Sequence, residues 1–171
     1  PYTTLFRSVA GLEETLVHTL KQQGLSLSTA ESCTGGLIAK RLTDIPGASQ
    51  TFLGGVVSYT NAVKQHVLGV PASLLETYGA VSAPVARAMA MGVRVLTGSD
   101  LALSVTGLAG PAGDDHGNPV GTVFTTLSTP QGVFVRQLAL GGDRERIRTL
   151  SAHHALDLLR RYLTDQMTGG E

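Results

Sequence analysis

Helices are predicted wherever apolar residues recur every three or four positions. Residues 9–23 show this spacing, and Gly24 follows it as a stop signal. Two more long helices are expected after Ser82 and Asp143, because both residue types are favoured N-caps. In the helix after Ser82, the stripe predicted to be buried comprises Val85, Met89, Val93 and Leu96. In the helix after Asp143, the apolar positions are Ile147, Leu150, Leu158, Leu159 and Leu163.

Shorter helices are expected in three other places. One begins after the turn at Gly36 and runs to about Leu42. Another is capped by Asn61 and extends through Leu68. The third covers residues 72–78 and ends at a glycine.

The remaining apolar segments alternate or are continuous, as strands buried on one or both faces are. The predicted strands cover residues 25–30, 51–60, 101–106, 122–128 and 133–140. A hairpin-like turn at residues 129–132 joins the last two. Helices and strands alternate for most of the chain before this hairpin. The sequence therefore predicts the α/β class: a three-layer α/β/α sandwich with a mostly parallel mixed sheet.

The chain is expected to form one domain over residues 9–165, because 171 residues match the size of a single hydrophobic core. Residues 1–8 lack any periodicity and are expected to be disordered or derived from cloning. Residues 166–171 are expected to form a frayed tail.

Composition narrows the classes of partner. Lys and Arg total 13, as do Asp and Glu, so no basic face is expected and nucleic acid is not an expected partner. No segment reaches the roughly 20 apolar residues of a membrane span, and no signal-peptide pattern opens the chain. Cys33 is the single cysteine, which excludes an internal disulfide and fits a reducing compartment. We therefore expect a cytoplasmic protein with no membrane partner.

Two glycine-rich turns leave predicted strands, at residues 32–36 and 106–113. Reactive sites in open α/β sheets lie at the carboxyl ends of the strands, so these turns should form walls of one pocket. Ser32 would project at that edge, and the amides of residues 34–36 would be free at a helix start to hold a phosphate or an oxyanion. The alternative is a capping serine with glycines that serve only the turn.

Lys64 follows the strand at residues 51–60, so the chain could return it beside Ser32. A lysine deprotonates serine only when desolvation or neighbouring positive charge lowers the pKa of its ammonium. Tyr59, at the end of the same strand, could exchange a hydrogen bond in this space. The alternatives are a solvated surface lysine and a tyrosine that anchors the edge of the core.

Other candidates carry a weaker signal. Cys33 is the rival nucleophile, although no histidine lies near it in the sequence and a buried structural cysteine is the commoner state. The five histidines show no spacing typical of a metal site. Arg146, in the first turn after Asp143, could bind a phosphate together with the helix start, or could be an exposed arginine in a salt bridge.

Six segments of the chain resemble the carboxy-terminal domain of the CinA competence/damage-inducible family, known as nicotinamide mononucleotide deamidase. They read TAESCTGGLIAKRLTDIPGAS, FLGGVVSYTNAVKQHVLGV, GAVS, LALSVTGLAGPAG, PVGTVF and GDRERIR. The first two are specific, and the six run in order over nearly the whole chain.

The resemblance implies an amidohydrolase of pyridine nucleotide salvage, which converts nicotinamide mononucleotide into nicotinic acid mononucleotide and ammonia. It places a serine–lysine pair on Ser32 and Lys64, with Tyr59 as a third catalytic residue. The positions that it implies for substrate binding are Thr34, Gly35, Gly36, Thr106, Gly107 and Arg146. The family fold is also a three-layer α/β/α domain.

We expect a small-molecule partner, the pyridine nucleotide, and a chemistry that needs no metal or organic cofactor. We also expect a homo-oligomer, with a dimer as its form. Two other functions stay open at this point: a catalytically inactive nucleotide-binding or regulatory module, and a hydrolase that depends on Cys33.

Overall fold

The computed structural model describes residues 11–165. Its helices are α2 (Leu12–Gln23), α3 (Leu37–Thr43), α4 (Asn61–His66), α5 (Ala72–Tyr78), α6 (Ala83–Thr97) and α7 (Arg144–Leu163), with a short 3₁₀ helix, η1, at Ala48–Gln50. Its strands are β1 (Leu27–Glu31), β2 (Phe52–Val57), β3 (Leu101–Gly107), β4 (Thr122–Thr129) and β5 (Gly132–Ala139). The expectations for residues 1–8 and 166–171 lie outside the described residues, as does the predicted start of the first helix at Val9.

The strands form one sheet in the order β2-β1-β3-β4-β5. β1 pairs in parallel with β2 and with β3, whereas β4 is antiparallel to both β3 and β5. Within this sheet β4 therefore runs against the other four strands. The predicted mixed, mostly parallel sheet is confirmed.

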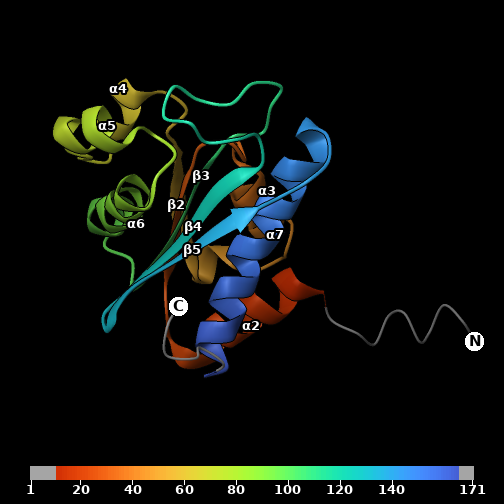
Figure 1. The fold of residues 1–171 in the computed structure, drawn as a ribbon. Helices are drawn as coiled ribbons and strands as arrows, with labels where there is room; N and C mark the ends of the chain where they lie inside the picture. Colours follow the sequence, from red (N-terminus) through yellow and green to blue (C-terminus); the bar gives the residue numbers. More distant parts are fainter. Residues whose placement is uncertain (1–10, 166–171) are drawn as a thin grey trace, which may run out of the picture.

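Helices cover both faces of the sheet and complete three layers (Figure 1). α2, α3 and α7 lie on one face, and α4, α5 and α6 lie on the other. The larger core packs under the first group and is built around residues of β1, β3, β4 and α7. A second core joins α6 to β1 and β3, and a third, of three buried residues, joins α6 to β4. The predicted α/β/α sandwich is confirmed.

The side chains of β3 explain how α6 packs so closely on the sheet. Leu101, Leu103 and Val105 belong to the larger core, so the residues between them face α6. Those residues, Ala102 and Ser104, are small, and the hydroxyl of Ser104 donates to the main-chain carbonyl of Ala86 in α6 at 2.6 Å. Strand β3 is buried along almost its whole length, which is typical of a strand covered on both faces.

Two local predictions were wrong. Thr60, and not Asn61, caps α4, because the hydroxyl of Thr60 accepts a hydrogen bond from the amide of Val63 three residues later. Leu96 was predicted to be buried but is 55% exposed. It lies in the last turn of α6, where it lines a surface groove with residues of α4 and α5 instead of packing on the sheet. The 3₁₀ helix η1 was not predicted.

No helix within residues 11–165 combines the length and the apolar character that crossing a membrane would require.

Candidate functional site

Parallel pairing brings the two glycine-rich turns to the same edge of the sheet. Glu31, the last residue of β1, pairs with Val105 of β3. One residue further on, the amide of Ser32 still donates to the carbonyl of Val105 at 3.0 Å. The turn that carries Ser32 therefore starts directly beside the end of β3, and the loop at residues 108–121 arches over this end of the sheet (Figure 1).

A cavity of about 300 Å³ lies between these turns. Its walls come from the turn after β1, the segment from β2 into α4, the residues before α6, the loop after β3 and the start of α7. The lining residues are Ser32, Cys33, Tyr59, Asn61, Lys64, Ala80, Val81, Thr106, Gly107, Leu108, Ala109, Gly110, Ala112 and Arg144.

Lys64 lines this cavity and is buried, with 1% of its surface exposed. Its Nζ lies 3.0 Å from Ser32 Oγ and 2.6 Å from the carbonyl oxygen of Ser58. β2 is the neighbour of β1 in the sheet, so the short helix that follows β2 begins next to the turn that follows β1. The structure thus brings together two residues that are 32 positions apart in the sequence.

The surroundings of Lys64 favour its neutral form. Burial lowers the pKa of its ammonium from the ordinary value of 10.5 to about 8, because a charged group loses hydration inside the protein. At pH 7 this raises the neutral fraction from about 0.03% to about 10%. A neutral amine 3.0 Å from a hydroxyl can accept its proton. Ser32 is itself nearly buried, with 9% of its surface exposed at the cavity.

Cys33 touches the cavity but belongs to the hydrophobic core, with 6% of its surface exposed. Burial raises the pKa of its thiol from 9.0 to about 11. The thiolate is the nucleophilic form of cysteine, so this environment keeps Cys33 inert at neutral pH.

Tyr59 and Arg144 close one side of the cavity. Tyr59 is 59% exposed, and its hydroxyl accepts a hydrogen bond from Arg144 Nη2 at 3.0 Å. Arg144 Nη1 donates to the carbonyl of Gly110 at 2.7 Å. One guanidinium therefore joins the segment after β2 to the loop after β3, across the cavity.

Arg146 does not line the cavity. It is exposed, its own amide donates to the cap residue Asp143 at 2.8 Å, and its aliphatic stem lies against Gly142. Arg144, which was not predicted from the sequence to bind substrate, lines the cavity, whereas Arg146 does not. The position of each arginine around the helix could have distinguished them. Arg144 is on the face of α7 that carries the buried Ile147, and Arg146 is rotated by about 200° from Arg144 around the helix axis.

The predicted contacts at residues 34–36 also differ from expectation. Thr34, Gly35 and Gly36 are absent from the lining of the cavity, and the amide of Gly35 donates to Ser32 O at 3.0 Å. The start of α3 is occupied by the buried carboxylate of Glu31, which accepts hydrogen bonds from the amides of Ile38 at 2.8 Å and Ala39 at 3.0 Å. This carboxylate binds amides in the first turn of α3, just after residues 34–36, whose amides were the ones predicted to hold an anion.

The other two predicted binding residues line the cavity. Thr106 is buried, and its hydroxyl donates to Ala80 O at 2.8 Å, which ties the end of β3 to the segment before α6. At Gly107 a Cβ would lie 2.7 Å from Val123 Cγ2 and 3.0 Å from Thr122 O, so glycine allows close packing of β3 on β4 there.

Among residues 11–165, no group of three or more His, Cys, Asp or Glu side chains is arranged to hold a metal ion. The site therefore consists of a buried serine–lysine pair, a tyrosine–arginine contact at its side and two glycine-rich turns.

Comparisons with known proteins agree on one family. The CinA C-terminal domain matches residues 9–163 of the chain. A CinA-like protein of Desulfotalea psychrophila is 56% identical over 144 residues, which are 84% of this chain and 35% of that protein. The chain spans little more than a third of the length of the curated relatives that it matches.

Solved structures give the same result. A CinA superfamily protein from Klebsiella pneumoniae superposes with a TM-score of 0.87 at 31% identity and covers 90% of this chain and 96% of that one. The competence/damage inducible protein CihA from Agrobacterium tumefaciens gives 0.85 at 39% identity, with 90% and 93% covered. The chain belongs to the CinA family, and the part of it that matches, residues 9–163, corresponds to the C-terminal domain of that family.

Proposed function

We propose that this domain hydrolyses the carboxamide of nicotinamide mononucleotide to give nicotinic acid mononucleotide and ammonia, with Ser32 as nucleophile and Lys64 as general base. The choice of nicotinamide mononucleotide as substrate rests on the resemblance of the sequence motifs to those of the CinA family. The observation that carries the chemistry is the buried Lys64 Nζ at 3.0 Å from Ser32 Oγ. A volume of about 300 Å³ lies at the lower end of the range of small-molecule sites.

The reaction proceeds in two stages. Neutral Lys64 takes the proton of Ser32, and Ser32 Oγ adds to the carboxamide carbon to form a tetrahedral oxyanion. The C–N bond then breaks, the departing nitrogen takes the proton from Lys64, and ammonia leaves an ester on Ser32. In the second stage Lys64 takes a proton from water, and the hydroxide adds to the ester carbon. The bond to Ser32 Oγ then breaks, Ser32 Oγ takes the proton back from Lys64, and the acid is released.

Lys64 contributes to the reaction in both its neutral and its charged state. In its neutral state it accepts a hydrogen bond from the serine hydroxyl and keeps donating to Ser58 O at 2.6 Å, which fixes its orientation. In its charged state the ammonium stays beside the oxygen that carries developing charge. A positioned base of this kind typically contributes about 10²–10⁴-fold to the rate.

Ammonia release by wild type, Ser32→Ala, Cys33→Ala and Cys33→Ser tests this assignment. We expect Ser32→Ala to lose several orders of magnitude while both Cys33 variants keep most of the activity. Activity that survives Ser32→Ala but not Cys33→Ser would transfer the reaction to Cys33. A wild type that binds the mononucleotide and releases no ammonia would identify an inactive binding module.

Arg144 is the cation that we assign to the phosphate of the substrate. It lines the cavity, and its two hydrogen-bond acceptors are the hydroxyl of Tyr59 and the carbonyl of Gly110, neither of which is a carboxylate. Its positive charge is therefore available to an anion at the side of the cavity. A charged hydrogen bond is worth about 1.5–3 kcal/mol, which corresponds to about 10- to 150-fold in binding.

The test compares Arg144→Ala with Arg146→Ala on two substrates. Arg144→Ala should raise the Michaelis constant for nicotinamide mononucleotide by that factor and change hydrolysis of nicotinamide riboside little, because the riboside lacks the phosphate. If Arg146→Ala shows this pattern instead, the original prediction for Arg146 is correct. Equal losses on both substrates for Arg144→Ala would contradict a phosphate contact.

A homodimer stays a prediction, which sedimentation velocity of the purified domain would check.

A further inference from the structure

Helix α7 makes a direct connection to the turn that carries Ser32. Arg148 Nε donates to the carbonyl of Cys33 at 2.9 Å, and Arg148 Nη2 donates to the carbonyl of Thr34 at 3.4 Å. Its side chain is partly buried, and it is absent from the lining of the cavity. Arg148 therefore contacts the two residues after Ser32 from behind the site.

Because Gly35 has no side chain, the guanidinium of Arg148 can lie directly against it. A Cβ at Gly35 would stand 2.8 Å from Arg148 Nη2, closer than real contacts of that kind. Gly35 also has φ +62°, a conformation that L-residues rarely adopt. Glycine at this position serves the turn and makes room for the arginine.

The rest of the turn is fixed on its other sides. The amide of Ser32 is bonded to Val105 of β3 at 3.0 Å, so the turn begins on the sheet. The carboxylate of Glu31 holds the amides of Ile38 and Ala39, so the helix after the turn is also fixed. The contact from Arg148 falls between these two anchors, on residues 33 and 34.

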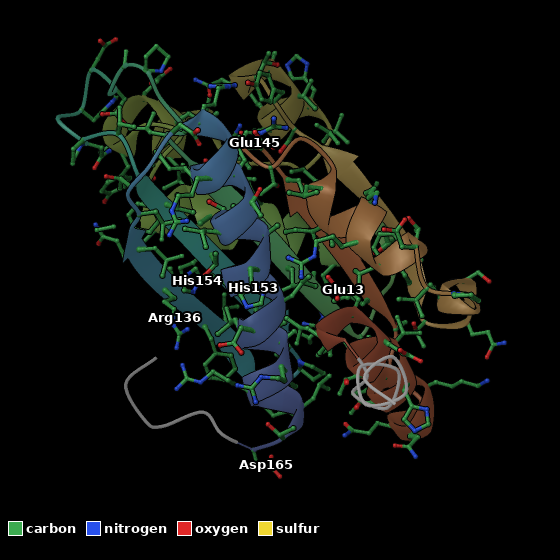
Figure 2. All side chains as sticks on the ribbon, turned by 90° about the vertical axis from the view of Figure 1, so that its right-hand side faces the viewer. Glu13, Arg136, Glu145, His153, His154 and Asp165 are labelled. Carbon is green, nitrogen blue, oxygen red and sulfur yellow. The ribbon has the colours of Figure 1, made fainter. Side chains whose placement is uncertain are left out.

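In Figure 2, Glu145 marks the first turn of α7, at the end of the helix that faces the site. His153 and His154 lie about halfway along the helix, and Asp165 lies just beyond its opposite end. Arg148 follows Glu145 by three residues, so it lies within the part of α7 that reaches the turn. α7 also packs against α3, the helix that this turn starts.

We propose that Arg148 is a positioning residue for the reaction: by holding the carbonyls of Cys33 and Thr34 in the space left by Gly35, it sets Ser32 Oγ within reach of Lys64 Nζ. This inference rests on the proposed role of Ser32 as the nucleophile. The position of a reacting atom matters because a displacement of about 1 Å can cost about 10²-fold in rate.

The test measures ammonia release from nicotinamide mononucleotide by Arg148→Met, Arg148→Lys and Gly35→Ala. We expect kcat per folded molecule to fall about 10- to 100-fold in Arg148→Met and Gly35→Ala, with the Michaelis constant within about twofold of wild type. Arg148→Lys keeps one donor and should recover part of kcat. The pH at which activity is half-maximal should not change, because Lys64 stays buried.

Two variants control for indirect effects. Gly24→Ala places a Cβ at a similar φ, +66°, with nothing within 4 Å, so it reports the strain of a positive φ without a steric clash. Thr149→Ala changes an exposed neighbour on α7. Both should keep wild-type kcat. Circular dichroism and thermal melting give the folded fraction of every variant, so a loss of folding cannot be mistaken for a loss of kcat.

The double variant Gly35→Ala/Arg148→Met gives the sharpest result. If the two residues act through one contact, it should be no slower than the slower single variant, because the second change removes nothing more. Losses that multiply would contradict a shared contact. A higher Michaelis constant with unchanged kcat would assign these residues to substrate binding and overturn the proposal.

A second readout separates this inference from the choice of substrate. The rate at which a small fluorophosphonate phosphonylates Ser32, with loss of fluoride, is followed by mass spectrometry and depends on the nucleophile and not on the nucleotide. If wild type is phosphonylated without hydrolysing the mononucleotide, the proposed substrate is wrong, and the Arg148 variants are still judged by their phosphonylation rates. Wild-type phosphonylation rates in Arg148→Met and Gly35→Ala would overturn the positioning role alone. An unreactive Ser32 in wild type would overturn both.

Discussion

The burial of Lys64 has a consequence for stability that does not depend on any substrate. Lys64 is 1% exposed, and burial lowers the pKa of its ammonium from 10.5 to about 8. The difference of about 2.5 corresponds to about 3 kcal/mol at about 1.4 kcal/mol per pH unit. We therefore predict that the stability of this protein changes with pH by about that amount through a single lysine.

The direction follows from the protons bound in each state. Below pH 8 both the folded and the unfolded chain carry a charged Lys64, so this residue contributes no pH dependence there. Between about pH 8 and 10.5 the unfolded chain keeps the proton and the folded chain has lost it. The unfolded state then binds more protons, so a rise in pH stabilises the folded state.

Urea unfolding of wild type and Lys64→Met between pH 7 and 10.5 measures this effect. The free energy of unfolding of wild type, relative to that of Lys64→Met, should increase by about 3 kcal/mol across the upper part of this range. The comparison removes the titration of other groups, which the two proteins share. Lys21→Met, at an exposed position on α2, controls for the removal of a lysine. A constant difference between wild type and Lys64→Met, or one that falls with pH, would refute the lowered pKa.

Three more predictions follow from the same geometry. The kcat/KM for ammonia release should rise with pH and level off above about 8, and Lys64→Arg should be as inactive as Lys64→Met, because arginine cannot give up its proton; an active Lys64→Arg would remove the base role. Iodoacetamide should label Cys33 in the native protein at least about 100-fold more slowly than in urea at pH 8, because burial raises the pKa of its thiol to about 11; rapid labelling, seen by mass spectrometry, would contradict this. Glu31→Gln should lower the free energy of unfolding by about 1–3 kcal/mol, since Ile38 and Ala39 donate to different carboxylate oxygens and the NH2 that replaces one of these oxygens cannot accept; unchanged urea midpoints would show that this cap is not needed.

The fold was predictable because local signals agreed with the global arrangement. Caps at Ser82 and Asp143 set the starts of α6 and α7 correctly, and both side chains accept from an amide three residues later. The order of strands and helices was enough to predict a mixed sheet between two helical layers. The errors arose where a single neighbour decides the outcome, as at Thr60, whose hydroxyl competes with Asn61 for the same helix start.

The site was predictable in part. Ser32 and Lys64 could be chosen from the sequence as chemical candidates, but the 3.0 Å between them depends on β2 lying next to β1, which periodicity does not specify. The role of Glu31 as an acceptor for the amides at the start of α3 could not be predicted from the sequence. Its carboxylate reaches Ile38 and Ala39 because the left-handed turn at Gly35 and Gly36 brings the helix start back over the strand end.

α7 connects the chemistry to the core of the protein. Arg144 and Arg148 are four residues apart, so both lie on the face of the helix that turns towards the site, and the buried Ile147 anchors that face in the larger core. One arginine contacts Tyr59 and Gly110 at the cavity, and the other contacts the turn behind Ser32. A core substitution beneath Ile147 would therefore move both contacts together and could not tell substrate binding from the positioning of the nucleophile. Separating the two roles requires changes that leave the helix in place, and the side chains of Arg144 and Arg148, taken one at a time, allow this.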